Sequence, residues 1–433
     1  MDEQKTARRP KVVIIGGGFA GINLAKKLKD KPVDVLLLDK HNYHTFQPLL
    51  YQVAMGYIEA DSIAFPLRRI FAKQKNFTFN LAEVQKINTD KNTISTNIGE
   101  IAYDYLVIAT GADTNFFGNK QIEHFAMPMK NVGEALNIRS FMLQNLEKAV
   151  IETDPAEKDA LLTFVVVGGG PTGVELSGAL AEIRDHVLVD DYPTLHEDDM
   201  KVYLVEGKHA VLGAMSSVAS KGASKFLEQM GVTVRTDVHV TEYDGNEIKI
   251  SDGQVIKTRN VFWAAGVTGL LPDGIQQGSM FRGNRLQTDE INRVMGYENI
   301  FSIGDVSAMI TDKYPNGLPG MAQPAIQTGQ HLAKNIMHLV NKEPTEPFKY
   351  FDKGSLATIG QNKAVADIGK LHFHGFVAWI LWMFVHLTSL VGFTNKLSVL
   401  GNWMLKYLTH NTDDRLIVRF FDTKTRMADP ETR

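Results

Sequence analysis

Hydrophobic and polar positions follow one another along the chain in blocks that predict a repeated strand–turn–helix unit. The segment KVVIIGGGFAGINLAKKL (11–28) begins with an apolar, β-branched run, passes through a glycine-rich turn and ends in an amphipathic helix. The segment TFVVVGGGPTGVELSGALAEI (163–183) repeats this order. Apolar runs that alternate with helical patterns are typical of parallel sheets covered by helices. The sequence therefore predicts an α/β chain with two such sheets.

The first glycine-rich turn carries a complete dinucleotide-binding fingerprint. Gly16, Gly18 and Gly21 follow the strand, and Asp39 closes the next apolar run. The glycines permit a tight turn and close approach of the backbone to a pyrophosphate, the helix N-terminus faces its charge, and the acid binds ribose hydroxyls. We expect a Rossmann-like domain with a bound dinucleotide, and a glycine-rich packing turn is the alternative.

The second turn has the same fingerprint with one irregularity. Gly168, Gly170 and Gly173 follow an apolar strand, but Glu206, at the end of the next strand, comes later than the usual spacing of about 20 residues. The polar stretch DDYPTLHEDDM (190–200) accounts for the extra length as an inserted loop. A chain with two dinucleotide sites passes something between its ligands, and a hydride is the obvious candidate.

Three further segments place small or acidic residues at the ends of strands. The segments 103–112, 260–269 and 299–309 each read as a strand followed by a turn. Small side chains let the backbone approach a flat cofactor. The candidate cofactor-binding residues in these turns are Ala109, Thr110, Gly111, Ala265, Gly266 and Asp305.

The paired fingerprints, the ATG at 109–111 and the GD at 304–305 resemble the flavoproteins with two dinucleotide-binding domains related to glutathione reductase. The resemblance spans residues 11 to about 340 and implies FAD in the first unit, with Asp305 near its ribityl or phosphate region, and NAD(P)H in the second. It leads us to expect a discontinuous FAD domain (1–114 and 285–355) and an inserted NADH domain (115–284), followed by a C-terminal region (356–433) whose own pattern predicts membrane binding.

Composition removes several chemistries. The chain contains no cysteine, which excludes a disulfide framework, an iron–sulfur cluster and a redox or nucleophilic thiol. Its 13 histidines form no ligand motif, so we predict no metal, and a net charge of −3 does not indicate a nucleic-acid partner. The short polar N-terminus leaves no room for a targeting peptide, which favours the cytoplasmic side of a prokaryotic cell.

Within that superfamily, two stretches of sequence reduce the number of possible reactions. NYHTFQPLLYQVA (42–54) and the AQPAIQ of residues 322–327 resemble the type II NADH dehydrogenases, single-chain NADH:quinone oxidoreductases, as does the GPTGVELSG form of the second fingerprint. Pro324 suits the first turn of a helix, which would place Ala322, Gln323 and Gln327 at its N-terminal end near the flavin. The glutamine amides would donate to a quinone carbonyl. The alternative is that Gln323 caps the helix and Gln327 is solvated.

The resemblance gives roles to four other residues. Pro48 and Leu49 would bring backbone closest to the flavin ring while the aromatic residues of 42–54 wall an apolar passage, although an ordinary core turn is the alternative. Glu175 would relay a proton between the nicotinamide and quinone sites; the alternative is that the helix dipole simply favours a carboxylate at this position. Lys363 would compensate the charge of reduced flavin, unless it is an ordinary exposed lysine.

The C-terminal pattern predicts a membrane-binding segment. No charged residue lies between Lys370 and Lys396, an interval long enough to span a bilayer, but polar residues interrupt its middle. An apolar helical stripe follows, with Lys396 and Lys406 available to anionic headgroups; its members are Leu400, Trp403, Met404, Tyr407 and Leu408. We expect interfacial amphipathic helices that deliver quinone from the lipid. A transmembrane span stays open, and the same surface also suits a dimer interface.

Together these features predict an FAD-dependent enzyme that takes a hydride from NADH and reduces a membrane quinone without pumping protons. We expect peripheral attachment to the cytoplasmic face of a prokaryotic inner membrane, and a homodimer. Two alternatives are a soluble, diaphorase-like NADH:acceptor reductase and a non-enzymatic flavoprotein that senses NADH. The charge-free C-terminal run disfavours both.

Overall fold

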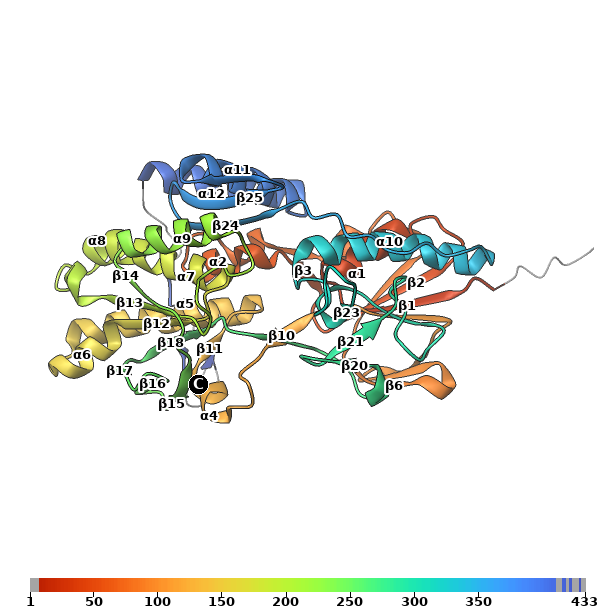
Figure 1. Cartoon of the computed structure of the whole chain (residues 1–433), viewed down its shortest axis with the longest axis horizontal. Coiled ribbons are helices and arrows are strands. Elements are labelled where there is room, and N and C mark those ends of the chain that lie inside the picture. The colour runs from red at the N-terminus through yellow and green to blue at the C-terminus, as the bar shows by residue number, and fades with distance from the viewer. Residues whose placement is uncertain (1–7, 410–414, 418–419, 423–427, 430–433) are drawn as a thin grey trace, which may run out of the picture. The chain divides into compact units, whose positions relative to one another are not determined.

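The computed structural model describes residues 8–409, 415–417, 420–422 and 428–429 (Figure 1). The chain divides into two compact units, each assembled from three separate segments. The first comprises residues 1–44, 65–113 and 267–352, and the second comprises 45–64, 114–266 and 353–433. We describe each unit by itself.

The first unit is built on a five-stranded parallel sheet, which confirms the predicted fold class. Its strands lie in the order β22 (Ile300–Ser302), β9 (Tyr105–Ile108), β1 (Lys11–Ile15), β2 (Asp34–Asp39) and β5 (Phe77–Leu81). Strands β22, β9, β1 and β2 are almost wholly buried because helices or loops cover both faces of a parallel sheet, whereas the edge strand β5 buries only Phe79. The predicted strands before the ATG and GD turns are β9, which pairs with β1, and β22, which pairs with β9.

Helices and smaller sheets complete the first unit. Helix α1 (Phe19–Lys27) follows β1 and packs along α10 (Ala322–Asn341). One antiparallel sheet contains β6 (Val84–Asn88), β7 (Thr93–Thr96) and β8 (Gly99–Ala102). Another three-stranded sheet contains β20 (Met280–Phe281), β21 (Arg285–Thr288) and β23 (Ser307–Met309).

The second unit repeats the parallel sheet. Its strand order is β11 (Met127–Pro128), β18 (Asn260–Trp263), β12 (Thr163–Val167), β13 (Lys201–Val205) and β14 (Val232–Arg235). Strands β15 (Val240–Tyr243), β16 (Glu247–Ile250) and β17 (Val255–Lys257) form a separate antiparallel sheet. The helices of this part are α2 (Leu50–Ala54), α4 (Lys120–Phe125), α5 (Val132–Ile151), α6 (Pro155–Leu162), α7 (Pro171–Glu182) and α9 (Ser217–Gln229).

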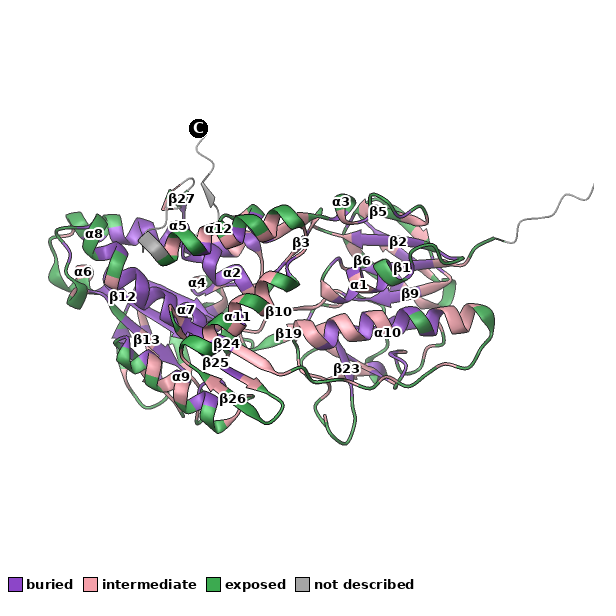
Figure 2. Ribbon diagram, turned by 90° about the horizontal axis from the view of Figure 1, so that it is seen from above, coloured by how far each residue is buried: buried purple, intermediate pink, exposed green. Residues whose placement is uncertain are grey.

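Helix α7 is the central helix of this unit, and Figure 2 colours most of it as buried. It continues into a π-helical turn (Ile183–Leu188) and α8 (Val189–Asp191). The polar stretch predicted as an inserted loop therefore begins in the last helical turn. A third sheet, of β24 (Ser355–Gly360), β25 (Lys363–Ile368) and β26 (Leu371–His374), packs on α7 through β24.

The C-terminal apolar run folds into two helices, α11 (Phe376–Ser389) and α12 (Phe393–Thr409). They are separated by a turn in which Gly392 has φ +91°. Among the described residues, no helix combines the length and apolar character needed to cross a membrane.

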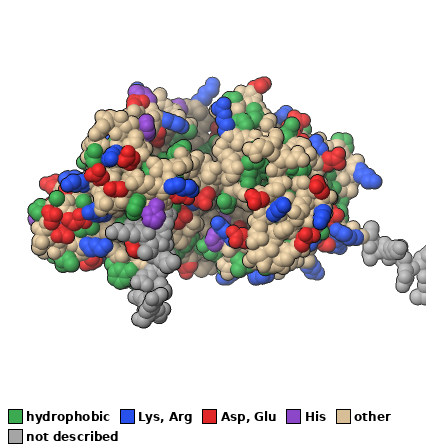
Figure 3. All heavy atoms as spheres, turned by 90° about the horizontal axis from the view of Figure 1, so that it is seen from below, with side chains coloured by type: hydrophobic (Ala, Val, Ile, Leu, Met, Phe, Trp, Pro, Cys, Tyr) green, Lys and Arg blue, Asp and Glu red, His purple; other side chains and the backbone are tan. Residues whose placement is uncertain are grey.

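The molecular surface carries charged side chains of both signs. On the face drawn in Figure 3, basic and acidic side chains are interspersed with scattered hydrophobic ones. This distribution agrees with the small net charge of −3 and is typical of a water-exposed surface.

Candidate active site

In the first unit, the glycine-rich turn has the geometry that a dinucleotide requires. Gly16 has φ +108°, and a Cβ there would overlap the carbonyl oxygen of Ala109. Gly18 caps α1, and a Cβ there would meet nothing within 4 Å, so the backbone is open to a ligand. Asp39 accepts a hydrogen bond from the Gly17 backbone N–H at 2.6 Å, which fixes its carboxylate at the turn. These residues fit FAD, with the helix N-terminus for pyrophosphate and Asp39 for ribose hydroxyls.

Two other predicted cofactor segments end at the same edge of this sheet. Thr110 and Gly111 follow β9, which pairs with β1, and Gly304 and Asp305 follow β22, which pairs with β9. The Gly304 Cα lies close to α1, because a Cβ there would stand 3.2 Å from Ala20. Ligands of open α/β sheets bind outside the carboxyl ends of the strands, so the structure gathers these residues where the sequence placed a cofactor.

The second unit repeats the turn in detail. Gly168 has φ +109°, and Gly170 caps α7 with open space around it. One carboxylate oxygen of Glu206 accepts the backbone N–H of Gly169, and the other accepts that of Lys208 at 2.7 Å. Glu206 thus stands beside its loop as Asp39 stands beside the first, which fits a second dinucleotide.

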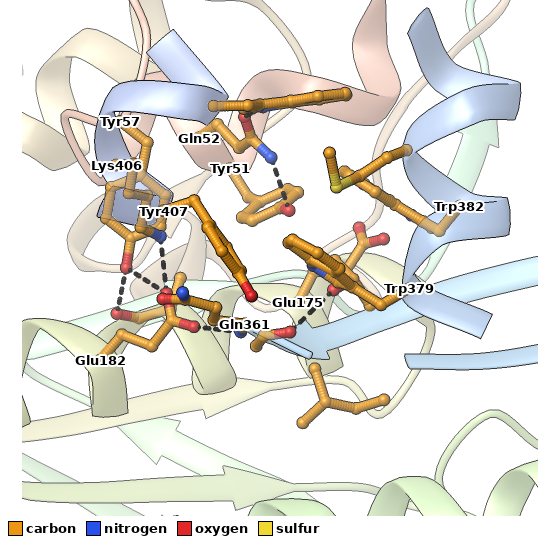
Figure 4. Close-up of a pocket in the computed structure, with 16 residues that line it drawn as sticks. Tyr51, Gln52, Tyr57, Glu175, Glu182, Gln361, Trp379, Trp382, Lys406 and Tyr407 are labelled. Atoms are coloured by element: carbon orange, nitrogen blue, oxygen red, sulfur yellow. Dashed lines mark hydrogen bonds and ion pairs between the residues drawn. The ribbon is translucent and has the colours of Figure 1, made fainter. Parts of the chain in front are cut away.

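A pocket lies against one face of α7. Glu175, Gly178, Ala179 and Glu182 recur at i, i+3, i+4 and i+7, which places them on one side of the helix. A Cβ at Gly178 would overlap the carbonyl oxygen of Ile359, so glycine lets β24 lie directly on the helix. The pocket next to this contact holds about 530 Å³ of empty space, part of it open to solvent. Its lining comes from α2, α7, β24, α11 and α12 (Figure 4).

The pocket wall is mainly aromatic. Trp382 of α11 packs against Trp403 of α12, with ring centroids 5.6 Å apart, and Trp379 stacks on Tyr407 at 5.6 Å. The Trp403 indole N–H donates to the side chain of Gln52 at 2.8 Å, and Gln52 in turn donates to Tyr51 at 2.9 Å. These contacts fix the two C-terminal helices against α2 and make a pocket suited to a flat apolar ring.

Glu175 is the acid at one end of this pocket. Burial raises the pKa of Glu175 to about 8, although the Thr358 backbone and the Trp382 indole favour the charged form. The carboxyl group is therefore mostly protonated at neutral pH. Glu175 and Tyr51 also line a second pocket of about 360 Å³, together with Pro48 and Thr172. The acid thus stands between an aromatic pocket and a pocket that contains a predicted flavin contact.

An ion pair occupies the other end. The Lys406 ammonium donates to Glu182 at 2.7 Å and lies 3.1 Å from the centroid of the Tyr57 ring (Figure 4). The Tyr57 hydroxyl and the Gln361 backbone N–H also donate to Glu182. Burial acts to raise the pKa of Glu182, but Lys406 and these donors outweigh it, so the pKa lies below its ordinary value. Burial lowers the pKa of Lys406, and Glu182 opposes that change.

The remaining predicted site residues lie elsewhere in the two units. Gln323 is in the first turn of α10 and does not cap it, since the N-cap is Met321. The Gln327 amide donates to the Phe351 carbonyl at 2.8 Å and accepts the Phe351 N–H at 3.1 Å, so it is not merely solvated. Leu49 is fully buried. Lys363 begins β25, half-buried, and is not among the described residues that line the aromatic pocket.

Of the two lysines expected to meet lipid headgroups, Lys406 has a buried partner inside the protein, while Lys396 makes one exposed contact with a backbone carbonyl and its headgroup role stays a prediction. Lys406 pairs with Glu182, and Lys396 donates to the Thr388 carbonyl at 2.6 Å. The predicted stripe on α12 is also divided, because Trp403 is 8% exposed and faces inward while Met404 is 57% exposed. The Trp403 indole packs against α11 and α2 because its burial there is more favourable than exposure on the outer face of α12.

Sequence reasoning missed Glu182, Lys406, Tyr57 and the pocket role of the tryptophans. One signal was available: Glu182 follows Glu175 by seven residues, on the same face of a predicted helix. Its lysine partner lies 224 positions further along the chain, and no local pattern connects the two.

Comparison with known proteins defines the class first. Residues 10–329 match the family described as pyridine nucleotide-disulphide oxidoreductase. Together with the two dinucleotide loops, this match makes the protein an FAD-dependent pyridine-nucleotide oxidoreductase. The absence of cysteine means that its reaction does not use a disulfide of its own.

The particular family follows from the rest of the chain. Residues 353–410 match the NDH2 C-terminal domain. The chain is 39% identical over 417 residues to the type II NADH:quinone oxidoreductase Ndh of Mycobacterium tuberculosis, covering 93% of this chain and 89% of that protein. It is 30% identical to the Staphylococcus saprophyticus type II NADH:quinone oxidoreductase, covering 83% and 90%. The chain belongs to the type II NADH:quinone oxidoreductases, which confirms the predicted family and its NADH-to-quinone reaction.

Solved structures agree on the fold. An NDH2 structure from Plasmodium falciparum in complex with NADH matches with a TM-score of 0.86 at 22% identity, over 95% of this chain and 100% of that one. The sulfide:quinone oxidoreductase of Aquifex aeolicus matches with a TM-score of 0.70 at 19% identity, over 93% and 96%.

Proposed function

We propose that the aromatic pocket of the second unit receives the quinone ring and that Glu175 supplies the proton this reaction needs. The observation that carries the proposal is the position of Glu175: it is buried, its pKa is raised to about 8, and it lines both the aromatic pocket and the pocket that contains Pro48. A buried, protonated acid beside a site for a flat apolar ring is suited to general acid catalysis.

The stoichiometry requires one proton from outside the two substrates. NADH, quinone and one proton give NAD⁺ and quinol, because the hydride brings two electrons and one proton. The second quinol O–H bond therefore forms with a proton from the protein, and Glu175 then recovers one from solvent. When bound, FAD accepts the hydride and passes its electrons to quinone.

The division of ligands between the parts remains our proposal. Its support is that the first unit presents the ATG and GD turns beside its glycine-rich loop, while Glu206 stands at the loop of the second. We assign FAD to the domain of 1–114 and 285–355, and NADH to that of 115–284. Pro48, Leu49, Gln323, Gln327 and Lys363 stay predicted contacts of the flavin and quinone, and their test is the two half-reactions of single variants.

We further propose that α11 and α12 bind the membrane surface. Both helices leave large apolar side chains exposed, and on α11 these recur in a stripe; the residues are Phe376, Val377, Ile380, Phe384, Phe393, Leu397, Met404 and Leu405. Such a face beside the pocket supports entry of the quinone from lipid. The cytoplasmic face of a prokaryotic inner membrane and a homodimer remain predictions.

The proposed quinone pocket can be tested by a substitution that fills it and leaves both dinucleotide loops unchanged. Met383 lines the pocket and is half-buried, so Met383→Trp should occupy its volume at little cost to folding. In stopped-flow experiments, flavin reduction by NADH should keep its rate, while reoxidation by a quinone should slow at least about tenfold. Normal reoxidation in a folded, FAD-loaded variant would show that quinone reacts elsewhere.

A further inference from the structure

We propose that Lys406 is a quinone-positioning residue, whose ammonium donates a hydrogen bond to the quinone oxygen remote from Glu175. The inference rests on the proposed function of the aromatic pocket. It adds a second polar contact to that pocket, contributed by a C-terminal helix.

The first support is the distribution of polar groups along the pocket. Glu175 and Glu182 are seven residues apart on one face of α7, which corresponds to about 10 Å along the helix axis. Figure 4 shows Glu175 beside Trp379 and Trp382, and Glu182 with Lys406 and Tyr57 on the opposite side. A para-quinone carries its two oxygens on opposite sides of the ring, so a ring between these groups would present one oxygen to each.

The second support is the hydrogen-bonding capacity of the ammonium group. Lys406 has three N–H donors, and among the described residues one acceptor, Glu182, binds it. The Tyr57 ring covers another side of the ammonium. A further donor is therefore available to a ligand. Lys406 is also the one Lys, Arg or His among the described residues that line this pocket.

The third support is that a buried ion pair contributes little to stability by itself. Desolvation of two charges largely cancels their attraction, and well-packed apolar residues often serve as well. Burial lowers the pKa of Lys406, and the Glu182 carboxylate that accepts its hydrogen bond at 2.7 Å favours the charged form. An ammonium held beside the ring would stabilise the negative charge that grows on that oxygen as electrons arrive, and it would keep its own proton throughout.

The experiment compares two ligands of similar shape on FAD-loaded protein. One is 1,4-naphthoquinone, and the other is 1,4-dimethylnaphthalene, in which methyl groups replace both oxygens. Calorimetry of wild type and Lys406→Met should show naphthoquinone binding about tenfold to a hundredfold more weakly in the variant, the range of a hydrogen bond to a charged group. Binding of dimethylnaphthalene should change by no more than about twofold, because it has no oxygen to lose.

Controls separate this role from a structural one. Lys249→Met removes a lysine from an exposed ion pair with Glu242 and should alter neither affinity. If Lys406→Met does not fold, Glu182→Leu combined with Lys406→Met removes both charges and allows the same comparison. Equal weakening of both ligands would mean that Lys406 only holds α12 in place, and unchanged naphthoquinone binding would mean that it does not touch the ring. Either result overturns the inference.

A wrong pocket assignment gives a different result from a wrong role for Lys406. Met383→Trp should abolish binding of both ligands when Lys406 is intact. If naphthoquinone still binds that variant normally, the proposed quinone pocket is wrong, whatever Lys406 does. If Met383→Trp blocks binding but Lys406→Met leaves it unchanged, the pocket stands and only the role of Lys406 falls.

Discussion

At the residue scale, two glutamates on one helix face have opposite properties. Glu175 lies among Trp382, Thr358 and other uncharged groups, and burial raises its pKa to about 8. Glu182, two turns later, has Lys406 as a partner and is held below its ordinary pKa. Carboxyl groups whose environments push their pKa values apart often have separate acid and charge-stabilising roles. The difference supports the proposed proton transfer from Glu175 and a charge-stabilising role for Glu182.

The pH dependence of the quinone half-reaction tests this assignment. Glu175 is protonated below its pKa of about 8 and loses its proton as pH rises through that value. The rate of flavin reoxidation by quinone should therefore fall between about pH 7 and pH 9. Glu175→Gln should slow reoxidation by about a hundredfold and remove this pH dependence, with flavin reduction by NADH nearly unchanged. Stopped-flow traces across this pH range are the measurement, and a variant that keeps the wild-type profile would exclude Glu175 as the acid.

We predict that a single residue, Glu206, also sets coenzyme choice. The Glu206 carboxylate is fixed by the backbone N–H groups of Gly169 and Lys208 and would repel a 2′-phosphate. We expect kcat/KM for NADH to exceed that for NADPH by at least about tenfold, a difference of about 1.4 kcal/mol. Glu206→Gln keeps an acceptor for the ribose but removes the charge, so it should narrow the difference. Comparable efficiency of the wild type with both coenzymes would contradict this role.

At the element scale, α7 connects the dinucleotide loop with the pocket. Its N-terminus follows the turn at Gly168–Gly170, and its middle packs on β24 at Gly178. The helix therefore holds Glu175 at a fixed position relative to both. A π-helical turn directly after Glu182 adds one residue to the helical path, and such turns are frequent at functional sites.

The helices α11 and α12 carry the membrane prediction at the same scale. Phe384 and Phe393 are 65% and 76% exposed, one on each helix. Burying an aromatic side chain of this size contributes about 1.5–3 kcal/mol. Phe384→Glu with Phe393→Glu should therefore lower binding to phosphatidylcholine vesicles by at least about a hundredfold in a sedimentation assay. Deleting the helices is a poorer test, because Trp382 and Trp403 are buried in the pocket wall.

The matched control for that experiment lies on α5. Ile151 and Val150 are 79% and 38% exposed, so Ile151→Glu with Val150→Glu places two carboxylates at other exposed apolar positions and should leave vesicle binding unchanged. Wild-type sedimentation of the double variant would contradict the membrane assignment. A double variant that binds vesicles normally but changes its oligomeric state would mark this face as a dimer interface.

At the scale of the whole molecule, each unit has the same structural motif on its own sheet. A glycine-rich loop follows a central strand, and an acid from the next strand bonds to that loop, as Asp39 does for Gly17 and Glu206 for Gly169. The C-terminal residues add the pocket-lining elements that this repeated motif does not contain. They contribute β24, α11 and α12 to the second unit, and with them most of the aromatic wall.

The sequence by itself determined the parts of this protein whose signals are local. A dinucleotide loop needs glycines and an acid at set positions around one strand and one helix, so the fingerprints at Gly16 and Gly168 could be read directly. The same holds for the strands at 105–108 and 260–263 and for Pro324 in the first turn of α10. The family resemblance added the reaction through motifs that are also short and continuous.

Only the tertiary structure decided which contacts the polar and aromatic residues of the aromatic pocket make. Lys406 and Trp403 look like headgroup and lipid contacts in a helical stripe, yet they bind Glu182 and Gln52 from distant parts of the chain. The pKa of Glu175 likewise depends on tertiary packing, because burial raises it while the Thr358 backbone and the Trp382 indole, from distant parts of the chain, favour the charged form. Burial and pairing of this kind arise from contacts between residues far apart in sequence, and hydrophobic periodicity carries no information about which partners meet.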